Sequence, residues 1–450
     1  MTLDLLTEIY SSFEPFQPPS KEAYVECQEV RGGWEIIREL GRKITRSKQP
    51  TCQLYSGHRG VGKSTELLRL KEYLEQQKYF VVYFAADDED IEPQDAAYAD
   101  ILFACTRHLV EAIKLQNHNP LLNWMKERWE SLKDLALTEI SFEGLSLEGQ
   151  ISQFAKITAN LRATPDKRRE LRQKINANTP SLVAALNDFI TEAQKTLPTD
   201  NRGIVMIADN LDRIVETQEE GKPSNYDEIY LNRSEMLRGL TCHVIYTVPI
   251  AMIYSKGRAT QLENNYDTPD VLPMVMVRNR DGSENSSGLG KLRELICRRV
   301  ALIEPNLVQT LEGGINGIDT PAVFDSPDTL KLLCLMSGGH VRNLMQLVQK
   351  AIDWTDELPI TAKAAKRAIE ETRETYRKTV QEHQWEVLAR VYQAREANND
   401  GEHLRLLLNR CLLEYRYYDE NEALQVWCNV HPLIERIPRF QDALARIQTL

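Results

Sequence analysis

The 450-residue sequence lacks the marks of several specialised protein classes. Its 8 cysteines include no Cys-x-x-Cys pair, so neither a zinc site nor a disulfide framework is indicated, and a reducing, cytoplasmic setting is expected. No apolar run approaches the length of a membrane span, and the first residues have no secretory signal, so no membrane association is expected. Positive charge is not in excess, because the net charge is −11, and this disfavours a surface that binds nucleic acid broadly.

What the sequence does contain is a glycine-rich motif of the form G-x-x-x-x-G-K-[ST]. It follows a short apolar segment at 51–56 and precedes an amphipathic helix, the context that a phosphate-binding loop requires. Glycines let backbone N–H groups point at phosphates, and the helix N-terminus adds positive potential. We therefore predict that ATP or ADP binds here, with Lys63 on the β- and γ-phosphates and the Ser64 hydroxyl on Mg²⁺. The predicted loop residues are Gly57, His58, Arg59, Gly60, Val61, Gly62, Lys63, Ser64 and Thr65.

A carboxylate at the end of an apolar strand is the second predicted element of this site. Asp209 follows the apolar segment 203–208, where it would hold Mg²⁺ together with Ser64. The next residue is Asn210, which cannot accept a proton from the attacking water. Asp212 is the next candidate for orienting or activating that water. Alternatively, Asp212 pairs only with Arg213, and hydrolysis is then slow; the sequence does not decide between these two interpretations.

Two further polar residues stand where a nucleotide-sensing group is expected. Thr247 ends the next apolar segment and would touch the γ-phosphate or the water, unless it is a buried threonine bonded to backbone. Arg342 follows Gly338-Gly339 at the start of a helix, a place from which an arginine can report the γ-phosphate. Arg258 could serve as an arginine finger for a neighbouring subunit, although a surface arginine is the favoured interpretation.

The apolar segments predict an α/β fold. Continuous apolar runs at 80–84, 203–209, 243–249 and 271–277 suit a parallel sheet that is covered on both faces. Helical periodicity dominates from Leu292 onward, and 415–418 with 424–428 predict a hairpin. The predicted fold is a P-loop NTPase core with a helical insertion, a helical lid and a C-terminal winged-helix-like domain. The predicted domains are 1–50, an N-terminal helical segment with an adenine-side element; 51–290, the core, with its insertion at about 97–196; 291–380, the lid; and 381–450, the winged-helix-like part.

The order of these elements resembles the AAA+/STAND branch of P-loop ATPases. The segment Ile204–Arg213 is similar to the Walker B box of KAP and NACHT ATPases, and Val30-Arg31-Gly32 resembles their adenine-side element with the Gly/Arg order changed. Val430–Ile434 resembles the Met-His-Asp-Leu box of NB-ARC proteins, with Pro432 in place of the aspartate. The resemblance implies that Arg31 lies beside the adenine and that His431 contacts the β-phosphate of ADP. Ser337–Leu344 is similar to the sensor-2 position.

Two functional classes follow from this resemblance. The first is a slowly hydrolysing nucleotide switch of the STAND type that works with a separate effector or sensor protein, with a role in bacterial antiviral defence and with assembly into a homo-oligomer on ATP binding. The second is a DNA-associated AAA+ ATPase, because origin-recognition-type initiators and transposition regulators share the layout. The predicted wing carries Asp419, Glu420 and Glu422, and an acidic wing is a poor reader of DNA. The sequence therefore favours the switch.

Overall fold

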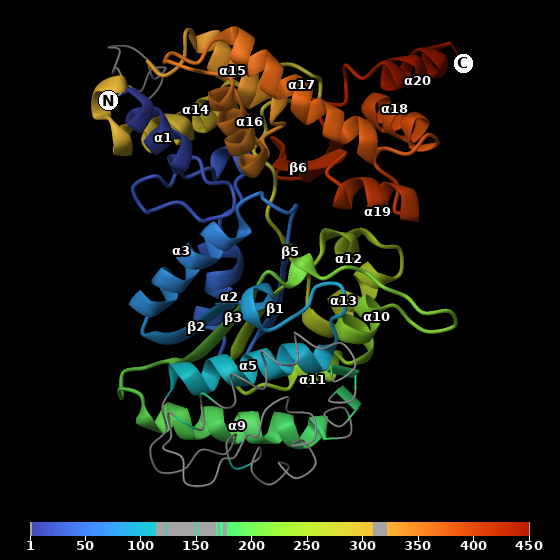
Figure 1. The fold of residues 1–450 in the computed structure, drawn as a ribbon. Coiled ribbons are helices and arrows are strands. Elements are labelled where there is room, and N and C mark those ends of the chain that lie inside the picture. Colours follow the sequence, from blue (N-terminus) through green and yellow to red (C-terminus); the bar gives the residue numbers. More distant parts are fainter. Residues whose placement is uncertain are drawn as a thin grey trace. The chain divides into compact units, whose positions relative to one another are not determined.

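The computed structural model describes residues 2–113, 178–308 and 322–449, with isolated positions at 123, 149, 152, 168–169 and 172–173. The chain forms two compact units, which are described separately (Figure 1). The first unit contains Met1–Glu35, Gly57–Thr65 and Leu272–Leu450, and the second contains Ile36–Ser56 and Glu66–Val271. The predicted four-part division remains a prediction. Among the described residues, no helix combines the length and the apolar character needed to cross a bilayer.

A five-stranded parallel sheet forms the centre of the second unit. Its third strand in chain order is apolar and fully buried from Ile204 to Ala208, as expected for a strand with helices on both faces. The predicted parallel sheet is confirmed, and the carboxyl ends of its strands meet at one edge because all of them run the same way. In spatial order the strands are β2 (Tyr79–Ala85), β3 (Gly203–Asp209), β4 (His243–Thr247), β1 (Cys52–Ser56) and β5 (Asp270–Val271).

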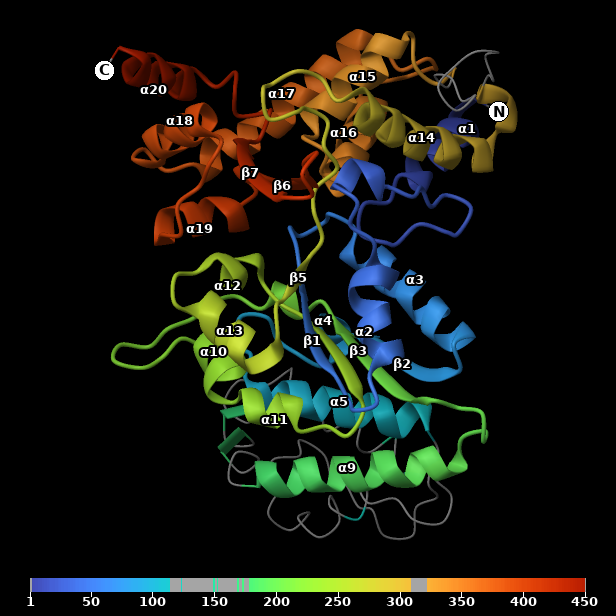
Figure 2. The same ribbon diagram turned by 180° about the vertical axis from the view of Figure 1, so that it is seen from behind.

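Two long helices, α5 (Tyr98–Ala112) and α9 (Thr179–Thr196), pack against each other and against β2 and β3 (Figures 1 and 2). They are the described ends of the predicted helical insertion at 97–196, whose middle lies outside the described residues. Helix α3 (Lys63–Gln76) begins at the end of the phosphate loop. The remaining elements of this unit are η2 (Ile37–Gly41), α2 (Arg42–Arg46), α4 (Ala86–Glu89), η4 (Leu211–Arg213), α10 (Asn225–Asp227), η5 (Glu228–Asn232), α11 (Ser234–Arg238), α12 (Ile250–Tyr254) and α13 (Arg258–Tyr266).

The first unit contains a bundle of helices whose starts are set by side-chain caps. Asn285, Ser326, His340 and Thr361 each accept a hydrogen bond from a backbone N–H in the first turn that follows, which satisfies a donor that would otherwise be unpaired. The predicted helical region after Leu292 is thus confirmed. The bundle consists of α1 (Thr2–Ser12), α14 (Ser286–Ile303), α15 (Pro327–Met336), α16 (Val341–Asp353) and α17 (Ala362–Thr379), with η1 (Glu29–Arg31) and η6 (Pro305–Leu307) as short turns.

The C-terminal part of this unit carries a small antiparallel sheet. Strand β6 (Leu412–Tyr418) pairs with β7 (Leu424–Val430), which confirms the predicted hairpin and lengthens both of its strands. The buried Trp427 ring stacks on Tyr415 with ring centroids 4.5 Å apart, which fixes one face of the hairpin. The accompanying helices are α18 (Gln384–Ala394), α19 (Gly401–Leu408) and α20 (Pro438–Gln448); α18 contacts β7 and α19 contacts β6.

One predicted strand is wrong. The apolar run 271–277 is expected to be a full core strand, but β5 ends at Val271. Pro273 has no N–H to give to a ladder. The backbone groups that follow bond elsewhere, because the Met276 N–H donates to the Val30 carbonyl and the Val277 carbonyl accepts from Asn285. The run is buried, as its apolar side chains predict, but it is buried as an irregular segment.

Candidate nucleotide-binding site

The phosphate loop is a tight turn that its own lysine closes. Gly60 and Gly62 have φ values of 89° and 112°, which side chains with a Cβ rarely adopt. A Cβ at Gly60 would lie 2.7 Å from the His340 ring, so the loop needs glycine for space as well. The buried Lys63 ammonium donates to the carbonyls of Gly57 and His58, at 2.9 and 3.1 Å. Backbone curled in this way around a lysine suits the oxygens of a polyphosphate.

Arg31 connects the phosphate loop to the irregular segment after β5. Its guanidinium is buried and donates to the carbonyl of Val61, at 2.8 Å, and to that of Pro273, at 2.9 Å. These bonds tie the predicted adenine-side element to the loop within one unit. Its contact with adenine stays a prediction.

The start of α16 bonds directly to the phosphate loop. The His340 ring accepts from the Asn343 N–H at Nδ1, so Nε2 carries the proton and donates to the Arg59 carbonyl at 2.6 Å. The Arg342 N–H donates to the Gly60 carbonyl at 3.1 Å. The Arg342 side chain donates to the Pro15 carbonyl, and its guanidinium lies 5.2 Å from the centre of the Phe16 ring. The backbone at Arg342 is therefore at the loop, whereas its predicted role at the γ-phosphate remains untested.

His58 bonds the phosphate loop to the C-terminal hairpin. Its buried Nε2 accepts a hydrogen bond from the Glu414 N–H of β6 at 3.1 Å. This bond requires a neutral ring, and burial, followed by the charges of Lys63 and Arg410, lowers the pKa of His58 to about 3. The histidine in the loop is thus held in its neutral form.

His431 is fully buried in the C-terminal part of the same unit. Its ring stacks on Tyr376 at 4.5 Å between centroids, and its Nδ1 accepts from the Leu433 N–H. Burial lowers its pKa to about 3, and the charges of Arg410 and His58 act in the same direction. These contacts are those of a core histidine, and a bond to a β-phosphate stays a prediction.

Sequence reasoning missed Arg410 and Glu414. Arg410 lies in the turn between α19 and β6 with a left-handed φ of 60°, and its charge lowers the pKa values of His58, His340 and His431. No local motif marks it, and among the many arginines and acids of the C-terminal region it looks like a surface residue. Glu414 acts through its backbone, which no side-chain pattern can reveal.

In the second unit, Asp209 ends β3 as predicted. Its buried carboxylate accepts from the Tyr83 hydroxyl at 2.8 Å and from the Asn210 N–H at 2.7 Å. Asn210 adopts a left-handed conformation with φ of 64°, and the chain then turns into η4, where Asp212 is buried. Arg213 pairs with Asp87 at 2.5 Å. An oxygen donor at the end of a parallel strand fits a hard cation such as Mg²⁺.

Thr247 holds the turn that carries Asp212. The fully buried Thr247 hydroxyl accepts from the Leu211 N–H at 2.9 Å and donates to the Ala208 carbonyl at 3.4 Å. This is the backbone-bonded arrangement that competes with a sensor role. Arg258 is held inside this unit by Asp227 and Glu216, each at 2.6 Å.

The structure thus brings the predicted residues together in two groups. The first unit holds the phosphate loop, Gly57 to Thr65, with Arg31, Arg342 and His431. The second unit holds Asp209, Asp212 and Thr247 along the edge where β3 and β4 end.

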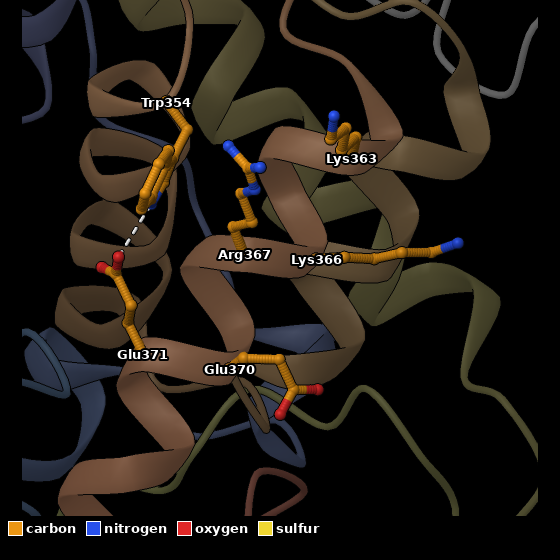
Figure 3. Close-up of a pocket in the computed structure, with 6 residues that line it drawn as sticks. All are labelled: Trp354, Lys363, Lys366, Arg367, Glu370 and Glu371. Carbon is orange, nitrogen blue, oxygen red and sulfur yellow. Dashed lines mark hydrogen bonds between the residues drawn. The ribbon is translucent and has the colours of Figure 1, made fainter.

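A separate pocket of about 580 Å³ lies between the end of α16 and the start of α17 (Figure 3). The half-exposed Trp354 indole donates to Glu371 at 2.8 Å, and the Arg367 guanidinium lies 4.5 Å from the centre of its ring. The residues that line the pocket include none of the predicted nucleotide-site residues. They are Trp354, Lys363, Lys366, Arg367, Glu370 and Glu371.

The fold and the loop define a P-loop NTPase domain, and comparison with known families agrees. Residues 35–220, which include the phosphate loop and Asp212, match the model of the KAP family P-loop domain. This match confirms the resemblance to P-loop ATPases. No curated protein matches the sequence.

Several solved structures are similar to this chain over nearly its whole length. The ORC1 protein of Aeropyrum pernix in complex with DNA shares 12% identity over 98% of both chains, with a TM-score of 0.37. The ORC2 protein of the same organism, in ADPNP–ADP complexes, shares 12% identity over 98% of both chains, with a TM-score of 0.41. A Walker-type ATPase of Pyrococcus abyssi shares 12% identity, with a TM-score of 0.41. This alignment covers 96% of the present chain and 99% of the Pyrococcus chain. The phosphate loop and the family match, rather than these similarities, carry the assignment of the nucleotide domain.

Proposed function

We propose that this protein is a nucleotide-controlled switch of the STAND type that binds ATP or ADP with Mg²⁺ and hydrolyses ATP slowly. One observation carries the proposal: the phosphate loop bonds both to the start of α16, through His340, and to the C-terminal hairpin, through His58. If α16 and the hairpin can take up more than one position against the loop, a nucleotide in the loop would bind these conformations with different affinities. A difference in affinity between two conformations is what allows a ligand to shift the equilibrium between them.

The residues in the turn after β3 are the reason for proposing that hydrolysis is slow. Lys63 would neutralise the β- and γ-phosphates, while Ser64 and Asp209 would hold Mg²⁺. Asn210 offers an amide where a carboxylate would accept a proton, so water activation would fall to Asp212. Thr247 would keep that turn in place through its bond to the Leu211 N–H.

The hairpin with its flanking helices is proposed to be a winged-helix-like domain, and a separate effector or sensor protein is the proposed partner. Assembly into a homo-oligomer on ATP binding and a role in antiviral defence rest on the resemblance to STAND proteins. The alternative is a DNA-associated AAA+ ATPase of the initiator or transposition-regulator type. The exposed Glu420 and Glu422 at the hairpin turn would repel phosphates, which favours the switch.

Replacing the loop lysine tests the core of this proposal. Lys63→Ala should reduce ATP and ADP affinity at least ~100-fold, because a buried phosphate contact is lost. Titration calorimetry on the full chain gives the affinities. Lys71→Ala, which removes a half-buried lysine of α3 that pairs with Glu75, serves as the control. Equal nucleotide affinity of the two variants would overturn the assignment of the site.

Asp212→Asn separates binding from hydrolysis. It should leave nucleotide affinity unchanged and slow single-turnover ATP hydrolysis by ~100-fold, the lower end of general-base contributions. Asp200→Asn changes an exposed carboxylate and should alter neither quantity. If Asp212→Asn hydrolyses ATP at the wild-type rate, another group activates the water.

A further inference from the structure

The tip of the β6–β7 hairpin exposes apolar side chains that would ordinarily be buried. Tyr418 and Leu424 are each 49% exposed, and Val426 is 40% exposed. Tyr418 lies directly opposite Leu424, and Val426 lies opposite Arg416. Because side chains alternate between the faces of a strand, these residues share one face of the hairpin. We call Tyr418, Leu424 and Val426 the tip face.

Acidic side chains border the tip face. The connecting turn carries Glu420 and Glu422, both exposed, next to Asp419. Asp419 is occupied in shaping the turn, since its carboxylate accepts from the N–H groups of Asn421 and Ala423. Asp419 stays ionised while it accepts these bonds, so it and the two exposed glutamates together supply negative charge beside an apolar surface.

The other end of the same strand reaches the nucleotide site. The Glu414 N–H donates to His58 of the phosphate loop, and the Tyr415 hydroxyl donates to the Gly338 carbonyl at 2.7 Å, before α16. A Cβ at Gly32, beside Arg31, would lie 2.2 Å from the Arg416 carbonyl oxygen. Strand β6 thus contacts the phosphate loop, the turn before α16 and the adenine-side turn within three consecutive residues, and two residues later it reaches the tip face.

We propose that the tip face is a docking surface for a partner protein that presents apolar side chains bordered by lysine or arginine, and that nucleotide in the phosphate loop changes the affinity of this docking through β6. The second part rests on the proposed function. A tyrosine between aliphatic side chains can act as an interface anchor, and the glutamates would attract a basic rim.

Charge distinguishes this partner from two other occupants. Nucleic acid would bring phosphates against Glu420 and Glu422, which costs rather than gains electrostatic energy. A second copy of the chain, meeting the same surface across a two-fold axis, would bring the same glutamates together. A basic partner alone gains from both the apolar face and the acidic turn.

The experiment uses the full chain and a displayed library of random 12-residue peptides as the probe. Peptides selected on the wild-type chain are synthesised with a fluorophore, and their binding is measured by anisotropy. Apolar peptides rich in lysine and arginine should be enriched. Their affinity should fall at least ~10-fold in Leu424→Ser and in the double variant Glu420→Lys/Glu422→Lys. These residues are exposed, so the variants should keep their circular dichroism spectrum. Leu302→Ser, which removes a 51% exposed apolar side chain of helix α14, away from the hairpin sequence, should bind like wild type.

Enrichment of acidic peptides, or equal affinity of wild type and the tip variants, would overturn the docking surface. The docking surface is also overturned if duplex DNA binding or self-association is what the tip variants lose. The link to nucleotide is read by repeating the titration with ATP and with ADP, where a change of ~3-fold or more is expected in wild type and none in Lys63→Ala. If the wild-type chain binds nucleotide by calorimetry but its peptide affinity does not change, the link to nucleotide is overturned. If the chain does not bind nucleotide at all, the proposed function is overturned and the docking result stands on its own.

Discussion

Gly32 and Gly33 allow the contact between β6 and the adenine-side turn to be tested by two adjacent substitutions. Both residues have positive φ, of 66° and 79°. A Cβ at Gly32 would lie 2.2 Å from the Arg416 carbonyl oxygen and 2.4 Å from the Tyr417 Cα, whereas a Cβ at Gly33 would meet nothing within 4 Å. Gly33→Ala thus carries the backbone strain alone, and Gly32→Ala carries the strain and the collision.

The two costs can be separated by magnitude. An alanine forced into the left-handed region costs ~1 kcal/mol in either variant. The collision at Gly32 is with backbone, which cannot rotate away, so β6 must move, and overpacking of this kind costs ~1–3 kcal/mol more. The difference between the variants should therefore lie in that range, and it should be localised in the hairpin.

Hydrogen exchange of the native protein measures this difference where it arises. A single melting temperature is poorly defined for a chain of two compact units, whereas amide protection is local. In peptides covering 412–430, Gly32→Ala should lower protection ~5- to 150-fold more than Gly33→Ala. Equal protection in both variants would show that β6 does not pack on Gly32, and the proposed route from nucleotide to hairpin would lose one of its three contacts.

The remaining predictions concern charge around the phosphate loop. The pKa values of His58 and His431, lowered to about 3, lie below that of an unfolded histidine, so the unfolded chain takes up protons first as the pH falls. The stability of the first unit should therefore be intact above about pH 6.5 and fall by roughly 2 kcal/mol per histidine at about pH 5. Amide protection of the β6–β7 hairpin at the two pH values, corrected for the intrinsic exchange rate at each pH, would show this loss; a flat profile would contradict the buried, neutral rings. Arg410→Gln should raise the pKa of both histidines and so reduce the further loss of stability below about pH 4, where the folded-state rings titrate, with Arg405→Gln, on the exposed side of α19, as the control; identical profiles of the two variants between about pH 5 and pH 3 would place the Arg410 charge away from the rings.

Those parts of the fold that depend on local pattern are predictable from the sequence. The bounds of β3 match the apolar run 203–209, because a buried parallel strand needs little besides apolar length. The phosphate loop is equally local, since its glycines, its lysine and the following helix lie within one short segment. The hairpin is evident from its two apolar strands and polar turn, but its length is underestimated because Leu412 and Val430 continue the pairing without a pattern that separates them from a helix end.

The contacts that define the site depend on long-range packing, and the sequence could not supply them. The expected strand stops before Pro273, which has no N–H for the ladder. The Pro273 carbonyl and the Met276 N–H bond instead to Arg31 and Val30, in a turn far away in the chain. The role of Gly32 depends on which backbone approaches it, and that of Glu414 on its N–H. Both roles depend on backbone contacts, which the identity of the side chains does not reveal, and both contacts are made by strand β6.

The bond between His58 and Glu414 joins residues 356 positions apart in the chain. A ribosome that adds ~5–20 residues per second needs roughly 20–70 seconds to synthesise that interval. The phosphate loop is therefore made long before the strand that bonds to it. A nascent chain that binds nucleotide early would do so before β6 has been synthesised. During synthesis, nucleotide binding would therefore precede the proposed response of the hairpin to nucleotide.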